Sequence, residues 1–366
     1  MKIAYFYPEK LPAKNARSIS IINTSCALSI ICDTTLIYEK SQNKKDIKEF
    51  YSLNSQNLNF LPLSKKFIIR SNKIFNFNLK KILQKYNFDI FYVRHLKMAK
   101  FLIENKSENS KIIFECHEIF SKNNSKVKYL EEFIIKNSDG LVFINDTLKE
   151  VFIEYFNLSK KLKKTIHNGC NFKFEYIKKD LSKIDEIYYI GNFYPWKGID
   201  FAIKAMTYLP ELKLKIIGSG NRLAELQNLT KKLKLNNVEF LGYKPQKEIK
   251  EILKKAKLTI IPNTKSDYSY FSTPIKLYEY LSASCIVISS DMPTIKEIIK
   301  DKKNGFLFET GNLNSYIETI KTILTYPEDK LLKISKNAYE ISKQFTWKNR
   351  AKEILEFSKE ILNEKN

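Results

Sequence analysis

The stretch NTKSDYSYFSTPIKLYEYLSASCIVISSDM, from Asn263 to Met292, decides the fold of the chain. It begins as a polar loop, continues as an expected helix over Ile275–Ala283, and ends in an apolar run, Cys285–Ser290. The β-branched composition of that run is typical of a buried parallel strand. We expect Thr273 to cap the helix and Pro274 to take its first position, where a missing N–H costs no hydrogen bond.

The start of this helix is suited to an anionic ligand. Free amide groups at a helix start attract anionic oxygens. Glu279 lies one turn inside the helix, and a carboxylate there can accept hydrogen bonds from sugar hydroxyls. The stretch therefore predicts a site that holds a nucleotide diphosphate at both ends. A capped surface helix with a solvated Glu279 is the alternative interpretation.

The composition is that of an α/β protein with two domains. Its 366 residues exceed one ordinary core. No apolar run reaches the roughly 18 residues of a membrane-spanning helix, and the N-terminal sequence has no signal-peptide pattern. The five cysteines are scattered without metal-ligand spacing, which predicts buried thiols in a reducing cytoplasm and no zinc.

The net charge of +23 predicts attraction to an anionic surface. Segment 62–88 mixes aromatic residues with cations and holds no acid before Phe88; the cations are Lys65, Lys66, Arg70, Lys73, Lys80, Lys81 and Lys85. This mixture favours contact with an anionic membrane and a peripheral location at the inner face of the cell membrane. A solvated basic face is the alternative, and we expect no nucleic-acid partner because no binding motif accompanies the charge.

Apolar strands and amphipathic helices alternate through both halves, which predicts parallel sheets covered by helices on both faces. The expected strands are Lys2–Tyr7, Thr34–Tyr38, Ile90–Val93, Lys111–Cys116, Gly140–Asn145, Lys164–Gly169, Glu186–Gly191, Lys213–Gly218, Val238–Gly242, Leu258–Asn263, Cys285–Ser290 and Gly305–Phe308. The fold class expected is α/β, with a first domain over 1–172, a linker over 173–185 and a second domain over 186–344. Two doubly wound domains facing each other predict a ligand cleft between them.

The second half also carries sequence motifs in a fixed order. They are IGNFYPWKGIDFAIKA, IIGSGNRLAELQ, VEFLGY, LTIIPN, STPIKLYEYLSAS and NGFLF, and the first half adds FECHE, DGLVFIN and IHNG. In these motifs the chain resembles glycosyltransferase family 4, the group 1 glycosyl transferases. The resemblance implies the GT-B fold of two Rossmann-like domains, an acceptor domain followed by a nucleotide-sugar domain. It also implies a terminal helix over 345–366 that packs back on the first domain.

The resemblance implies a donor-binding set and three catalytic candidates. The donor set comprises Gly191, Asn192, Lys197, Gly218, Tyr243, Ser272, Thr273, Pro274, Ile275, Lys276 and Glu279. Lys197 would stabilise the diphosphate, Glu279 would hydrogen-bond the ribose, and His117 would approach the donor sugar. No metal is implied, and no cofactor beyond the nucleoside-diphosphate sugar as co-substrate.

Two positions depart from the family pattern. Asn192 stands where the family usually has arginine, and Phe271 stands where it has the first of two glutamates. Lys276 is the candidate to supply the missing charge. The identity of the sugar is left open by the loss of that glutamate.

Residues at the strand ends of the first half are candidates for acceptor contacts. They are Asn15, Arg17, Ser18, Arg94 and Glu118. Alternation along the chain predicts that Glu118, rather than Glu115, lies beside His117. We also expect Asp146 or Thr147 to cap the helix over Leu148–Phe156.

The function expected from the resemblance is a retaining glycosyltransferase. It would move a sugar from a nucleoside diphosphate, with UDP favoured, to lipopolysaccharide, capsule or a lipid-linked oligosaccharide at the cytoplasmic membrane face. One alternative is a nucleotide-sugar 2-epimerase of the same architecture. The other is an inactive partner that binds donor or membrane for a second transferase.

Overall fold

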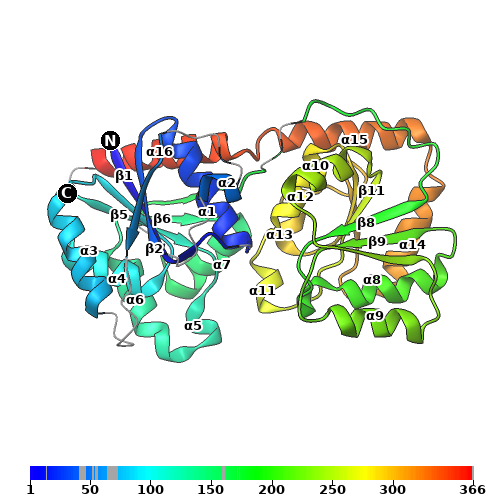
Figure 1. Cartoon of the computed structure of the whole chain (residues 1–366), viewed down its shortest axis with the longest axis horizontal. Coiled ribbons are helices and arrows are strands. Elements are labelled where there is room, and N and C mark those ends of the chain that lie inside the picture. The colour runs from blue at the N-terminus through cyan, green and yellow to red at the C-terminus, as the bar shows by residue number, and fades with distance from the viewer. Residues whose placement is uncertain are drawn as a thin grey trace. The chain divides into compact units, whose positions relative to one another are not determined.

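The computed structural model describes residues 1–364 apart from 14, 41–46, 52, 54–56, 64–72, 159–160, 171 and 173. The chain forms two compact units (Figure 1). Met1–Gly169 and Trp347–Asn366 make the first unit, and Cys170–Thr346 makes the second. Segment 173–185, which we expected to be a linker, lies within the second unit, where Lys179 and Leu181 are buried.

The first unit is built on a seven-stranded sheet in the order β3-β2-β1-β4-β5-β6-β7. Each pair of neighbouring strands runs parallel. The strands are β1 (Lys2–Leu11), β2 (Asp33–Lys40), β3 (Asn59–Leu63), β4 (Ile90–Val93), β5 (Lys111–Cys116), β6 (Gly140–Phe143) and β7 (Lys163–Thr165). A parallel order of this kind requires a crossover between successive strands, and the helices provide it.

Helices cover both faces of this sheet (Figure 1). They are α1 (Ala16–Ser29), α2 (Ile47–Phe50), α3 (Lys73–Lys85), α4 (Leu96–Asn105), α5 (Phe120–Asn123), α6 (Lys128–Asn137), α7 (Asp146–Phe156) and α16 (Trp347–Asn363). One core joins α1 and α16 to the sheet, and α16 contributes Ala351, Ile354, Phe357 and Ile361 to it. The cap of α7 is Asn145, whose side chain accepts a hydrogen bond from the Leu148 amide, so the predicted cap at Asp146 or Thr147 is wrong.

The second unit is built on a six-stranded sheet in the order β10-β9-β8-β11-β12-β13, again parallel throughout. The strands are β8 (Glu186–Ile190), β9 (Lys213–Ile217), β10 (Val238–Gly242), β11 (Leu258–Ile261), β12 (Ile286–Ser290) and β13 (Phe306–Phe308). The order reverses beside β8, where β9 lies on one side and β11 on the other. Ligands of doubly wound sheets bind at the carboxyl ends of strands where the order reverses.

Two cores hold the helices of this unit on opposite faces of its sheet (Figure 1). The helices are α8 (Ile199–Ala205), α9 (Leu223–Lys232), α10 (Gln246–Lys255), α11 (Asp267–Tyr270), α12 (Ile275–Ser282), α13 (Pro293–Lys296), α14 (Leu313–Leu324) and α15 (Glu328–Ser342). One core contains residues of α8, α9 and α14, the other contains residues of α10 and α12, and α15 contributes to both. The prediction of α/β, doubly wound architecture is confirmed in each unit.

Differences from the prediction fall on short or edge elements. Strand β3 was not predicted because Pro62 lies inside it, and proline is confined to edge strands, which is where β3 lies. Part of the basic segment 62–88 forms α3, while residues 64–72 lie outside the described residues. None of the helices that the structure describes is long and apolar enough to cross a membrane.

Candidate functional site

Three loops of the second unit, those after β8, β9 and β11, share the carboxyl edge of its sheet. Gly191 and Gly218 have φ angles of 148° and 143°, which favour glycine. A Cβ on Gly218 would lie only 1.9 Å from the carbonyl oxygen of Gly191. Both glycines therefore serve the close packing of two loops, a role that requires no dinucleotide.

Lys197 is held at this edge by its neighbours. It ends a short 3-10 helix, Pro195–Lys197, and precedes Gly198, whose φ of 64° is left-handed. A Cβ on Gly198 would lie 1.8 Å from the carbonyl oxygen of Pro262, in the loop after β11. The Thr264 amide also donates to the carbonyl of Trp196 over 3.1 Å. The loop that carries Lys197 is thus fixed against the end of β11.

The N-cap and the first residue of helix α12 each lie one position later than predicted. Pro274 is the N-cap, with an extended backbone, and Ile275 is the first helical residue, so the prediction of Thr273 as cap is wrong. Proline suits this position because it has no N–H to leave unpaired. Thr273 and Pro274 are buried and Ser272 is half-buried. The first amides of α12 keep the orientation that favours an anion.

Lys276 lies in the first turn of α12 and reaches back toward β8. Its Nζ lies 3.7 Å from the centre of the Tyr189 ring. A Cβ on Gly191 would lie 2.8 Å from that Nζ. Within the described part of the chain, Nζ is buried and has no hydrogen-bond partner. The structure thereby brings Gly191 and Lys276 together, as the donor-site prediction requires.

Burial shifts the three ionisable groups of this region toward their neutral forms. Desolvation lowers the pKa of Lys197 to about 8. Desolvation, and then the charge of Lys197, lower the pKa of Lys276 well below its ordinary value. Desolvation raises the pKa of Glu279 to about 7, against the opposing effect of Lys276. An anion bound beside these groups would favour the charged forms of the two lysines that burial disfavours.

The remaining donor candidates have no contact with Lys276 among those described above. Asn192 is half-buried, and its carbonyl accepts a hydrogen bond of 2.8 Å from the Tyr189 hydroxyl. Tyr243 follows β10 and is exposed. Phe271 is buried and packs edge-on against the Tyr270 ring. The position where the resemblance implies a first glutamate is therefore taken by a buried aromatic side chain.

Asn263, which follows β11 at the same edge, was not predicted as a site residue. Its side chain is buried, and neither its amide nitrogen nor its carbonyl oxygen has a partner among the described residues. The available signal in the sequence was an asparagine just after an apolar strand. Buried amides normally find hydrogen bonds, so an unpaired one points to a ligand.

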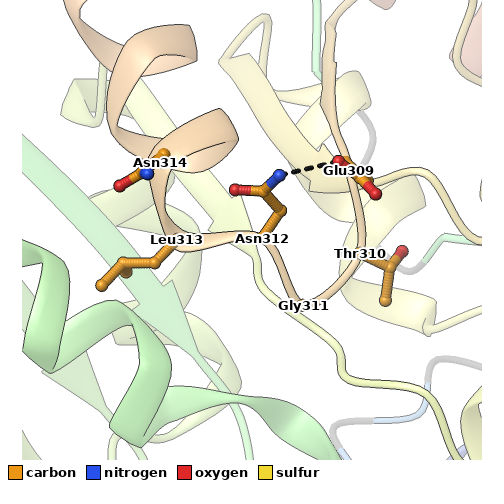
Figure 2. Close-up of a pocket in the computed structure, with 6 residues that line it drawn as sticks. All are labelled: Glu309, Thr310, Gly311, Asn312, Leu313 and Asn314. Atoms are coloured by element: carbon orange, nitrogen blue, oxygen red, sulfur yellow. Dashed lines mark hydrogen bonds between the residues drawn. The ribbon is translucent and has the colours of Figure 1, made fainter.

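A hollow of about 400 Å³ lies after β13 and is lined by Glu309, Thr310, Gly311, Asn312, Leu313 and Asn314 (Figure 2). Asn312 caps α14 and donates to Glu309 over 2.7 Å. Asp291 holds this loop by accepting hydrogen bonds from the amide and hydroxyl of Thr310. None of these residues belongs to the set around Lys276.

In the first unit, His117 pairs with Glu115. The Nε2 atom of His117 contacts a carboxylate oxygen of Glu115, so the prediction that only Glu118 shares its side is wrong. Residues two apart at a strand end project from the same face, and Glu115 and His117 have that spacing. Burial and the nearby Arg94 lower the pKa of His117 to about 4. The imidazole is therefore neutral at pH 7, with Nε2–H donating to Glu115 and Nδ1 as an acceptor.

Arg350 of α16 holds Glu115 in place and was not predicted. Its guanidinium donates to Glu115 over 2.7 Å, to the Thr24 hydroxyl, and to the carbonyls of Ile166 and His167. Despite the opposing effect of burial, the charge of Arg350 holds the pKa of Glu115 well below its ordinary value. The signal in the sequence was an arginine on the apolar face of the last helix.

The other acceptor candidates cluster at the ends of β1 and β4. Asn15 caps α1 by accepting from the Ser18 amide over 2.8 Å, and the Ser18 hydroxyl donates to the Ala13 carbonyl. Arg17 forms an exposed ion pair with Glu9. Arg94 follows β4 and is half-buried, and burial lowers its pKa. Asn15 and Ser18 thus have structural roles whatever else they contact.

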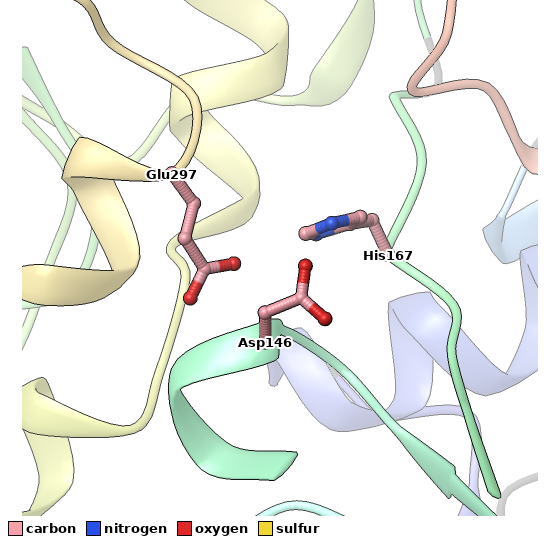
Figure 3. A group of neighbouring side chains, drawn as sticks. All are labelled: Asp146, His167 and Glu297. Atoms are coloured by element: carbon pink, nitrogen blue, oxygen red, sulfur yellow. The ribbon is translucent and has the colours of Figure 1, made fainter. Parts of the chain in front are cut away.

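Asp146 and His167, also in the first unit, are drawn in Figure 3 together with Glu297 of the second unit. Asp146 accepts hydrogen bonds from Lys149 and from the Thr165 hydroxyl. Burial raises the pKa of Asp146, but these hydrogen bonds outweigh it and the pKa is lowered overall. Asp146 is therefore an ionised residue that ties α7 to β7.

Residues 173–341, nearly all of the second unit, match the family model described as glycosyl transferases group 1. The second unit is a group 1 glycosyl transferase domain. Its match covers the loops of Lys197 and Gly218 and the whole of α12, so the residues brought together above lie inside the family region.

Curated glycosyltransferases resemble this chain over part of their length. An uncharacterized glycosyltransferase of Methanocaldococcus jannaschii is 27% identical over 62% of this chain and 61% of its own length. A Campylobacter jejuni N-acetylgalactosamine-N,N'-diacetylbacillosaminyl-diphospho-undecaprenol 4-alpha-N-acetylgalactosaminyltransferase is 27% identical over 62% of this chain and 63% of its own. The matches to both proteins thus span about three fifths of their length.

Solved structures share the fold of this chain over nearly its whole length. HepE of Anabaena, solved with UDP, superposes with a TM-score of 0.79 at 16% identity, over 98% of this chain and all of HepE. The lipopolysaccharide outer core galactosyltransferase WaaB superposes with a TM-score of 0.73 at 16% identity, over 98% of this chain and 99% of WaaB. Identities this low establish the fold.

Proposed function

We propose that this protein is a retaining, metal-independent glycosyltransferase that moves a sugar from a nucleoside diphosphate to a surface-glycan acceptor. The observation that carries the proposal is the convergence of Lys197, Lys276 and the start of α12 at one sheet edge of a group 1 domain. UDP is the favoured nucleotide, supported by the UDP bound to HepE. A surface glycan is supported by relatives named for colanic acid and amylovoran biosynthesis.

The proposed reaction breaks the bond between the anomeric carbon and the diphosphate oxygen. The acceptor oxygen attacks the same face of the sugar, and its proton passes to the departing diphosphate. Lys197, Lys276 and the amides at the start of α12 stabilise the charge that develops on this leaving group. Glu279 accepts hydrogen bonds from the ribose, and neutral His117, oriented by Glu115, contacts the transferred sugar. We assign the acceptor to Asn15, Arg17, Ser18, Arg94 and Glu118.

The donor site is tested by thermal stabilisation with UDP, GDP and ADP. We expect one diphosphate to stabilise the wild type, and the Lys197→Ala and Glu279→Ala variants to lose this shift. Lys204→Ala is the control because Lys204 is exposed on α8. Equal shifts in all four proteins would refute the donor site.

The reaction class is tested by nucleotide release. A transferase releases UDP from its sugar donor much faster with an acceptor than without, whereas a 2-epimerase turns over the donor alone. An inactive partner would bind UDP and do neither. Activity that is unchanged after treatment with EDTA is expected from the proposed metal independence, and activity lost with EDTA would refute it.

The proposed site of action is the cytoplasmic membrane face, reached through segment 62–88. In its described part, Phe77 of α3 is 58% exposed, and Lys81 lies 4.5 Å from its ring centre. Exposed aromatic and basic residues on one helix favour anionic lipid surfaces.

We expect Phe77→Asp to weaken co-sedimentation with phosphatidylglycerol vesicles several-fold at low salt, where charge attraction is strong. Tyr208→Asp is the matched control, because Tyr208 is 59% exposed in the second unit. Equal binding by both variants would refute a role for α3.

A further inference from the structure

The amine of Lys276 is an unusual feature of the second unit. The residue is only 9% exposed, and its Nζ has no hydrogen-bond partner in the described part of the chain. An ammonium group in such a place is costly unless a ligand or a counter-charge compensates it. The buried amine of Lys276 therefore does not contribute to the folding stability of the second unit, and a role in ligand binding explains it better.

The surroundings of this amine come from three elements. Tyr189 of β8 offers the face of its ring, and Glu279 of α12 offers a carboxylate whose attraction opposes the loss of the proton. Lys197, on the 3-10 helix after β8, faces it with a like charge. Burial and that repulsion together lower the pKa of Lys276 well below its ordinary value, so the free amine tends to be neutral.

The amine of Lys276 occupies the space that a side chain at position 191, in the loop after β8, would fill. Gly191 leaves room for it, since a Cβ there would lie 2.8 Å from Nζ and 3.1 Å from the adjacent Cε. The next residue, Asn192, can donate a hydrogen bond but carries no charge. The helix thus delivers a potential cation to the start of this loop, where Asn192 carries no charge.

We propose that Lys276 is the second diphosphate-binding cation of this site, supplied by α12 in place of a charge on the β8 loop, and that it takes up a proton when the diphosphate binds. This inference rests on the proposed function. The diphosphate brings the counter-charge that burial denies to the free protein, and the proton comes from solvent. No covalent bond changes.

The experiment is calorimetric titration with UDP at about pH 8.5, in two buffers that differ in their enthalpy of ionisation. At this pH Glu279 is ionised in the free protein, because its pKa is about 7, so its own proton release does not mask the uptake. We expect Lys276→Met to weaken UDP binding about 10- to 100-fold, as loss of a charge-assisted hydrogen bond does. We also expect it to take up about one proton fewer than the wild type. Lys204→Met, on the outer side of α8, should change neither value.

Charge rescue separates a binding role from a structural one. Asn192→Arg in the Lys276→Met background restores the missing cation from the loop itself, so UDP affinity should recover about tenfold or more. Proton uptake should stay low, because arginine is already charged. Inorganic pyrophosphate, titrated in parallel, should follow the same order of affinities if the contact is to the diphosphate.

The outcomes distinguish this inference from the proposed function. If Lys197→Met loses UDP binding but Lys276→Met keeps both affinity and proton uptake, the inference is wrong and the donor site stands. If neither variant loses affinity, both are wrong. If Lys276→Met loses affinity and Asn192→Arg restores none of it, Lys276 acts through structure, and the inference is also wrong.

Discussion

Two side chains of the proposed donor site have pKa values near neutrality, Lys197 at about 8 and Glu279 at about 7. The proposed function needs each of them in its charged form, the ammonium for the diphosphate and the carboxylate for the ribose. UDP affinity should therefore rise as Glu279 loses its proton near pH 7 and fall as Lys197 loses its proton above about pH 8. Calorimetric titration from about pH 6 to about pH 9.5 measures both limbs.

Two variants assign the limbs of this profile. Glu279→Gln should move the acid limb toward about pH 6, where the phosphate itself titrates. Lys197→Met should weaken binding at all pH values. It should also remove the contribution of Lys197 to the alkaline limb, which is about a tenfold loss of affinity per pH unit for one proton. A wild-type profile that is flat between these limits would contradict the assigned roles.

The places of single residues in the fold were predictable where the local sequence carries the signal. Lys197 lies after β8 and Glu279 lies inside α12, as expected, and their donor-binding roles stay predictions. The partner of His117 was not predicted, because Glu115 and Glu118 are equally near in sequence and only the end of β5 decides between them. Arg350 was missed since its four acceptors come from distant segments, among them Thr24 and Ile166.

At the scale of elements, the ion pair between Arg350 and Glu115 fastens α16 to β5. Glu115→Gln removes the charge and leaves a buried guanidinium uncompensated, so we expect a loss of about 3 kcal/mol in the free energy of unfolding at pH 7. Because the pKa of Glu115 is lowered in the folded protein, this contribution is present above the ordinary glutamate value of 4.5 and is lost as the pH falls below it.

Urea unfolding at pH 7 and at low pH measures this difference. Glu118→Gln is the matched control, because Glu118 lies outside the ion pair and should change stability by less than about 0.5 kcal/mol. Equal losses in the two variants would show that the carboxylate at position 115 does not hold the helix.

Two glycines with nearly the same backbone test how the Lys197 loop is fixed. Gly198 and Gly242 have φ angles of 64° and 66°, so alanine costs about 1 kcal/mol of backbone strain at either position. Only Gly198 faces a carbonyl oxygen, that of Pro262, whereas nothing lies within 4 Å of a Cβ on Gly242.

We therefore expect Gly198→Ala to cost about 2 kcal/mol more than Gly242→Ala in urea unfolding. It should also weaken UDP binding, because it displaces the residue next to Lys197. Equal stability of the two variants would mean that the loop moves freely away from Pro262.

Most elements were predictable from sequence because apolar runs and amphipathic periods are local signals. Strands β4, β5 and β10 were predicted with their observed limits. Strand β3 was not, since a proline inside a short edge strand hides its pattern. The cap of α12 was placed one residue early, because threonine is a preferred cap and proline is not, so tertiary packing decided the position.

At the scale of the whole molecule, the last helix belongs to the first unit. Phe357 of α16 is buried in the core that holds β1 and α1. Phe357→Ala should lower the stability of the first unit by about 3–5 kcal/mol. The change lies close in sequence to α15, which belongs to the second unit.

Hydrogen exchange read by segment locates the effect. Protection should fall in β1 and α1 while α14 and α15 stay protected, and the exposed neighbour Lys359→Ala should change neither. Loss of protection confined to α14 and α15 would contradict the assignment of α16 to the first unit. The alternation of strands and helices predicted two doubly wound units, but only the resemblance to a family indicated which of them takes the last helix.

The place of α16 has a consequence for synthesis of the chain. The ribosome completes residues 1–169 long before it reaches Trp347, at a rate that makes the interval roughly 10–40 s. Throughout that interval the apolar side chains that α16 later covers, including those of Ile21 and Ile22, lack their cover. The nascent first half is therefore a natural client for a holding chaperone. The first unit begins to be synthesised before the second, but its core is complete only after the last helix has been made.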